Sequence, residues 1–145
     1  MILFSSALEP ILEYKIIMNK LVIDVVSEKI FLMIITKDDI YNITKENTKI
    51  NYEKLTLILK DFLYSNSLKL EDITNIYVNR GPGSFAGIRN SLSLVKAFNV
   101  SRKIDYFCYS FNDFKDQKDI KYEDIPNLCE KFKIKKNLIN PIYLS

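Results

Sequence analysis

Histidine and tryptophan are absent from this chain of 145 residues, which also contains only three glycines and two cysteines. Without histidine there is no Ser-His-Asp or Cys-His nucleophile and no histidine-containing metal site. The cysteines, Cys108 and Cys129, are too few and too far apart for a zinc site or a disulfide framework. We therefore expect no bound metal, reduced thiols and a cytoplasmic location.

The chain also has little excess charge. Its 21 basic and 18 acidic residues give a net charge of +3, and its only arginines are Arg80, Arg89 and Arg102. A protein that reads RNA directly gathers Arg and Lys on one face with aromatic residues between them, so we expect no direct contact with nucleic acid. Hydrophobic residues make up 48% and charged residues 27%, which is typical of a folded globular domain.

The first seventeen residues, MILFSSALEPILEYKII, are apolar but too short to span a membrane, and two glutamates and a proline interrupt them. We expect no membrane segment. Met18 stands directly before the first predicted strand, so either Met18 is the natural start or the preceding residues are a loosely attached extension. The expected division is an extension at 1–17, a domain at 18–110 and a short, charged C-terminal remnant at 111–145.

Apolar patterns predict a mixed sheet with helices packed on it. Two β-rich runs separated by Ser27-Glu28 indicate an antiparallel pair, and an alternating run indicates a third, more exposed strand. Two helices with apolar faces follow, the first with Asn51 as its N-cap. The expected elements are strands at Lys20–Val26, Lys29–Thr36 and Asp39–Thr44, a helix at Tyr52–Asn66, a strand at Asn75–Val78, a helix at Ser84–Val100, a strand at Ile104–Ser110 and a short helix near Tyr122–Phe132. This order favours an α/β fold that looks like the RNase H-like layout.

Both long helices carry apolar residues outside the core-facing stripe. In the first helix Leu57 and Tyr64 point almost opposite to the core face, which indicates a second neighbour. That neighbour is either a partner chain or another part of this chain. In the second helix Leu94 and Ala97 widen the apolar arc, so we expect this helix to be covered on more than one side.

All three glycines lie in one stretch, GPGSFAG at Gly81–Gly87, between a predicted strand and a predicted helix. Backbone amides and a helix N-terminus at such a place can bind an anion. The spacing G-x-G-x-x-x-G, however, is neither that of a dinucleotide-binding loop nor that of a Walker loop, and the loop has no lysine. A tight turn needed for packing is the favoured interpretation, and a phosphate cradle is the alternative.

Asp24, at the end of the first predicted strand, is the one carboxylate at a position where actin-like ATPases hold a metal or phosphate-binding acid. An isolated aspartate at a strand end is more often a turn former. No second acid lies at a suitable spacing, so we expect no catalytic residues. The alternative function is a small nucleotide-binding, ATPase-like protein that uses Asp24 and the Gly81–Gly87 loop.

The stretch GPGSFAGIRNSLSLVKAF closely resembles the signature GPGSFTGLR, followed by a helix of small residues, of the TsaB family, also called YeaZ. KLVIDVVSEK is similar to the family's opening strand, ILAIDTSSE, and NYEKLTLILKDFL to its first helix, which begins with His-Ser-Glu. The closing NPIYLS is similar to the family's P-x-Y-L-R. The resemblance extends from about Met18 to Tyr109 and includes the last few residues.

The resemblance implies an actin-like, RNase H-like fold and a role in making threonylcarbamoyladenosine (t6A) beside the anticodon of tRNA. In that pathway TsaD, a metal-containing homologue, transfers the threonylcarbamoyl group, TsaE is an associated ATPase, and TsaB is a non-catalytic partner that docks on TsaD helix to helix. The resemblance thus implies a scaffold subunit that is not an enzyme and has no cofactor. Its expected partners are a TsaD-like transferase, a TsaE-like ATPase and, in isolation, a second copy; tRNA is contacted only indirectly.

The chain departs from the family pattern at several polar positions. Ala86 replaces the loop threonine, Val25 replaces the threonine after Asp24, and Asn51 replaces the histidine that begins the helix. Each change removes a polar or small group of the family pattern that a nucleotide or a partner could contact, which argues further against nucleotide binding. The family's second α/β subdomain has no counterpart after Ser110, so we expect a fold whose second half is largely missing.

The residues expected to matter form three groups. The signature loop comprises Gly81, Pro82, Gly83, Ser84, Phe85, Gly87 and Arg89; the partner interface comprises Tyr52, Leu57, Tyr64, Asn90, Leu94 and Ala97; and Asp24 is the expected contact of any nucleotide.

Overall fold

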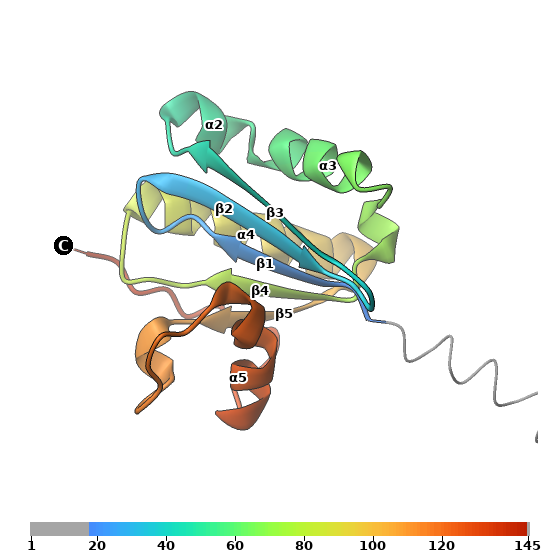
Figure 1. Cartoon of the computed structure of the whole chain (residues 1–145). Helices are drawn as coiled ribbons and strands as arrows, with labels where there is room; N and C mark the ends of the chain where they lie inside the picture. Colours follow the sequence, from blue (N-terminus) through green and yellow to red (C-terminus); the bar gives the residue numbers. More distant parts are fainter. Residues whose placement is uncertain (1–17, 145) are drawn as a thin grey trace, which may run out of the picture.

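The computed structural model describes residues 18–144, apart from the side chain of Tyr52, so the expected extension at 1–17 lies outside the described residues. A five-stranded mixed sheet with the order β3-β2-β1-β4-β5 forms the centre of the fold. Figure 1 shows α3 and α4 on one face of this sheet and α5 on the other.

The strands form where the β-rich runs predict them. They are β1 (Lys20–Asp24), β2 (Lys29–Ile35), β3 (Ile40–Glu46), β4 (Asn75–Asn79) and β5 (Asp105–Tyr109). The antiparallel pairing of β1 with β2 places Lys20 opposite Ile35, and β3 continues the meander on the far side of β2. The parallel pairing of β1 with β4, and of β4 with β5, makes the sheet mixed, which confirms the α/β layout expected from the order of elements.

The helices agree with the sequence in place but not in every boundary. They are α2 (Lys49–Glu53), α3 (Leu55–Ser65), α4 (Phe85–Arg102) and α5 (Ile125–Lys131), with short 3₁₀ turns η1 (Leu70–Asp72), η2 (Phe111–Asp113) and η3 (Tyr122–Asp124). The prediction that Asn51 caps the first helix is wrong. Asn51 lies inside α2, where its side-chain amide donates to the carbonyl oxygen of Glu46 at 2.6 Å, and α3 begins only after Lys54.

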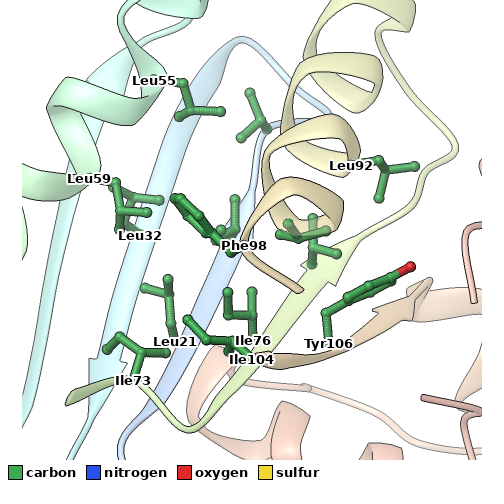
Figure 2. Close-up of a cluster of buried hydrophobic side chains, with 14 of the residues drawn as sticks. Leu21, Leu32, Leu55, Leu59, Ile73, Ile76, Leu92, Phe98, Ile104 and Tyr106 are labelled. Atoms are coloured by element: carbon green, nitrogen blue, oxygen red, sulfur yellow. The ribbon is translucent and has the colours of Figure 1, made fainter. Parts of the chain in front are cut away.

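The larger core lies between the sheet and the pair α3 and α4. Figure 2 shows Leu59 of α3 and Phe98 of α4 coming together over Leu21 and Leu32 of the sheet. Alternation along the strands sends successive side chains to opposite faces. Accordingly Leu21 belongs to this core, whereas its neighbour Val22 belongs to a second core on the other face.

The second core is covered by the segment 111–134, which contains η2, η3 and α5. Val22, Met33 and Tyr77 of the sheet are buried against this segment, whose own contribution is Phe114, Ile125, Leu128 and Cys129. The last residues then return along β5 toward the glycine loop, where Tyr143 forms a parallel bridge with Gly83. Both faces of the sheet therefore carry packed layers, although the chain has only a short stretch after β5.

Candidate functional site

The glycine loop joins β4 to α4, and its glycines provide space for the protein's own backbone. Gly81 has φ +115°, and a Cβ atom added to it would lie 2.1 Å from the carbonyl oxygen of Ile142. A Cβ added to Gly83 would lie 2.3 Å from the carbonyl oxygen of Val26. Only glycine permits this φ and these close approaches. The space that the glycines create is therefore filled by the C-terminal tail and by the β1–β2 turn.

Backbone hydrogen bonds fix the tail against this loop. The Ile142 N–H donates to the carbonyl oxygen of Arg80 at 2.7 Å, and the Leu144 N–H donates to that of Gly83 at 3.4 Å. On the other side of the loop, the Ser84 N–H donates to the carbonyl oxygen of Val26 at 2.9 Å. The resemblance of NPIYLS to a family ending thus has a structural counterpart, because the tail binds the signature loop.

Arg80 connects the C-terminal tail and the segment 111–134 to the end of β4. Its guanidinium makes a two-pronged contact with Asp113, with nitrogen–oxygen distances of 2.7 and 3.3 Å, and also donates to the carbonyl oxygen of Asn140 at 3.0 Å. Paired donors of this kind fix orientation as well as charge. Asp113 in turn accepts from the Ser110 N–H at 2.8 Å, so η2 is held in the same network.

Asp24 is enclosed by the protein. Asp24 is only 4% exposed to solvent. Its Oδ2 accepts hydrogen bonds from the Tyr122 hydroxyl at 2.7 Å and from the Asn79 side-chain amide at 3.1 Å. Its Oδ1 accepts from the Val26 N–H at 3.2 Å, a turn-forming contact. Burial, followed by the nearby Asp24 charge, raises the pKa of Tyr122, so this hydroxyl keeps its proton and acts as a donor.

Asn79 links Asp24 to the glycine loop. Its side-chain oxygen accepts from the Gly81 N–H at 2.9 Å while its side-chain nitrogen donates to Asp24. The first amide of the loop and the strand-end carboxylate are therefore satisfied by the same buried asparagine. No group of three or more His, Cys, Asp or Glu that could hold a metal occurs between residues 18 and 144.

The outer side of the loop presents aromatic rings to solvent. The Phe85 and Tyr143 rings lie 4.6 Å apart between centroids, and the Arg89 guanidinium lies 6.0 Å from the Phe85 ring centre. This is a cation–π geometry at an exposed site. Arg89, one of the residues expected in the signature loop, therefore places its guanidinium over Phe85.

The residues expected at a partner interface fall into two classes. Leu57 and Tyr64 are 58% and 81% exposed on the outward face of α3, so the second neighbour expected for this face is not found within residues 18–144. On α4, Ala97 is exposed, whereas Asn90 is half-buried and Leu94 is half-buried against the larger core. Tyr52 lies in α2, and its side chain is outside the described part of the structure.

The two cysteines are structural. Cys108 on β5 and Cys129 on α5 are both buried and unbonded. Burial raises the pKa of each thiol to about 12, from an ordinary value of 9.0, so neither is a nucleophile at neutral pH.

Known proteins resemble this chain in sequence and in fold. No family model matches the chain. Over 87 residues it is 28% identical to a protein named tRNA threonylcarbamoyladenosine biosynthesis protein TsaB from Buchnera aphidicola subsp. Schizaphis graminum, a match that covers 60% of this chain and 41% of that protein. The resemblance to the TsaB family is thereby confirmed.

Two solved structures show the same fold. YeaZ from Pseudomonas aeruginosa matches with a TM-score of 0.60 and 18% identity, covering 64% of this chain and 44% of that one. A structure described as an uncharacterized protein with similarity to peptidase YEAZ, from the same organism, matches equally well and is covered to 43%. The fold is thus the actin-like, RNase H-like mixed sheet that the resemblance implied. The chain spans less than half the length of each of these relatives.

None of the helices within residues 18–144 is long and apolar enough to cross a membrane.

Proposed function

We propose that this chain is a non-catalytic subunit in t6A modification of tRNA, and that it binds a TsaD-like transferase through the outward faces of α3 and α4. Its similarity to a protein named for threonylcarbamoyladenosine biosynthesis supports the pathway. The main support for the docking surface is the exposure of Leu57 and Tyr64, two large apolar side chains that lie two turns apart on the same face of α3. Exposed apolar side chains in register along a helix are typical of protein–protein contacts.

Two further large apolar side chains are exposed on the other helices, and we include them in the proposed surface. Ile50 of α2, seven residues before Leu57, is 63% exposed, and Val100 near the end of α4 is 74% exposed. With Leu57, Tyr64 and Ala97 they form what we call the helix surface. In this proposal the signature loop sets the direction of α4, because its glycines are closed against the tail and the β1–β2 turn.

The internal bonds of Asp24 and the loop support a role without catalysis. A nucleotide at this place would have to displace Tyr122 and Asn79 from the Asp24 carboxylate, and each lost buried hydrogen bond costs about 1–3 kcal/mol. A TsaE-like ATPase remains a further proposed partner, and tRNA is contacted through the transferase.

The proposal is tested by measuring the t6A content of tRNA in a system where this chain is the only TsaB-like component. The variant Leu57→Glu/Tyr64→Glu places two charges on the helix surface without touching the core, and we expect t6A to fall at least about tenfold because each buried charge costs several kcal/mol at a packed contact. Leu94→Glu is unsuitable because Leu94 packs against the core.

A matched control changes the net charge by the same two units elsewhere. Lys115→Gln/Lys118→Gln does so on exposed residues of the segment that covers the other face of the sheet, and should leave t6A unchanged. Normal t6A with the Leu57→Glu/Tyr64→Glu variant contradicts the proposed surface.

A further inference from the structure

Within residues 18–144, the outer edge of β3 has backbone groups that pair with no other strand. In its ladder with β2, the Asn47 N–H donates to the Glu28 carbonyl oxygen at 2.8 Å and the Thr36 N–H to that of Asp39 at 2.9 Å. Hydrogen-bonded pairs alternate along an antiparallel ladder. By this alternation Tyr41, Ile43 and Lys45 direct their backbone groups toward β2, whereas Ile40, Asn42 and Thr44 direct theirs away from the sheet. No described strand pairs with this edge; at its end, the Asn51 side-chain amide donates to the outward carbonyl oxygen of Glu46.

The side chains along this edge are more apolar than an exposed strand requires. Ile40 is 45% and Tyr41 is 36% exposed, and a groove of about 620 Å³ runs between β3 and α3. Ile43, Ile58 and Phe62 supply apolar lining to the groove. An open edge of this kind is a template for pairing with another strand.

The sequence of β3 is complementary to itself. In an antiparallel pair centred on Asn42, Tyr41 lies opposite Ile43 of the other strand and Lys45 lies opposite Asp39, each contact occurring twice. Asp39 shares the face of Tyr41, and the nearby Asp39 carboxylate raises the pKa of the Tyr41 hydroxyl. Aromatic–β-branched pairs and opposite charges across strands are both stabilising. All six outward N–H and C=O groups of Ile40, Asn42 and Thr44 find partners in this register.

We propose that a second copy of this chain is the partner of this edge, the two β3 strands pairing antiparallel about Asn42 to form a continuous ten-stranded sheet. The other registers that keep each side chain on its face are worse. Centring on Tyr41 places Lys37 opposite Lys45, and centring on Thr44 places Lys45 opposite Ile43. Centring on Ile43 leaves the Asp39–Lys45 ion pair unmade. Shifting the register between the two β3 strands by an odd number of residues would place the apolar faces of the two copies on opposite sides of the joined sheet.

This dimer uses a different surface from the one proposed for the transferase. The α3 residues that line the groove are Ile58, Asp61, Phe62 and Ser65. Leu57 and Tyr64 do not line it and are exposed to solvent. An experiment can therefore disprove the β3 dimer without disproving transferase binding, and the reverse.

Sedimentation velocity of the full chain across the micromolar to millimolar range tests the dimer. Asn42→Pro removes the two central N–H donors while leaving the ladder to β2 intact, because the Asn42 N–H points outward, and proline is tolerated on edge strands. We expect the dissociation constant to rise about tenfold or more. Circular dichroism checks that the variant is folded.

Charge reversal gives a second measure that does not depend on proline. Lys45→Glu and Asp39→Lys should each weaken the dimer several-fold, and combining them should restore it, since the pair is re-formed with opposite polarity. Leu57→Glu should leave the dimer unchanged. A wild-type chain that stays monomeric, a dimer indifferent to Lys45→Glu and Asp39→Lys, or a dimer abolished by Leu57→Glu overturns the proposal.

Discussion

Replacing Gly81 by alanine tests directly what the glycine loop does. The backbone at Gly81 has φ +115°, which costs an alanine about 1–3 kcal/mol, and the new Cβ would lie 2.1 Å from the Ile142 carbonyl oxygen. The tail must move away, which breaks the hydrogen bonds from Ile142 to Arg80 and from Arg80 to Asn140, worth about 1 kcal/mol each. The free energy of unfolding should therefore fall by about 3–5 kcal/mol.

Urea denaturation followed by circular dichroism measures this loss, and a tail deletion separates its two parts. In a chain ending at Asn140 the carbonyl of Ile142 is gone, so Gly81→Ala should cost only the backbone strain, at least about 1 kcal/mol less than in the full chain. Gly83→Ala is the matched control. Its Cβ would meet Val26 instead of the tail, and Gly83 has only one long hydrogen bond to the tail, so the costs in the two chains should differ less than they do for Gly81→Ala.

The reasoning is refuted if Gly81→Ala changes the free energy of unfolding by less than about 0.5 kcal/mol, which is the range of ordinary surface substitutions. An equal cost in the full and shortened chains would also refute it, because the tail would then not be what requires a glycine at this position.

Three further predictions concern the buried network and the thiols. Tyr122→Phe keeps the ring stacked on Phe31 but removes the hydrogen-bond donor to Asp24. The free energy of unfolding, measured by urea denaturation, should therefore fall by about 1–3 kcal/mol. An unchanged value would mean that the Tyr122 hydroxyl does not stabilise the Asp24 carboxylate. Cys108 and Cys129 should resist a thiol reagent at pH 8 until the protein is unfolded, and rapid labelling of the native protein would contradict their burial. Because their pKa is about 12 when folded and 9.0 in the ordinary state, the folded protein binds more protons between these values. Stability should therefore decline as pH rises above about 9, which denaturation between pH 8 and 10.5 measures; a flat profile would refute the shift.

Much of the fold was predictable because short-range patterns determine it. The alternation of Leu21 and Val22 between two cores follows from the period of a strand, and the strand-to-helix place of GPGSFAG follows from its flanking patterns. The break at Lys54 between α2 and α3 was missed because the apolar spacing of α3 continues backward across it.

The site was only partly predictable because its contacts join distant residues. The sequence favours a turn-forming role for Asp24, with nucleotide contact as the alternative, but its partner Tyr122 lies 98 residues away and nothing in the sequence marks that residue. Likewise the glycines suggested an anion site or a tight turn, whereas the group that fills the space at Gly81 belongs to the tail. Asn79 and Arg80 precede the signature and gave no signal of their own.

The exposed and buried faces of the helices were also only partly predictable from the sequence. The spacing of apolar residues suggested a surplus on both long helices, and only the packed structure separates Leu57, which is open to solvent, from Leu94, which rests against the core. Helical periodicity gives the direction of a side chain from its own helix but not the position of the neighbouring elements.

The most direct measurement is a calorimetric titration of this chain into a TsaD-like transferase, comparing the wild type with Leu57→Glu/Tyr64→Glu and with Lys115→Gln/Lys118→Gln. We expect saturable binding by the wild type and the lysine variant, and an affinity about tenfold to a hundredfold weaker for the α3 variant. Equal affinities for all three proteins, or no binding by the wild type, would contradict the claim that this chain acts through its helix surface.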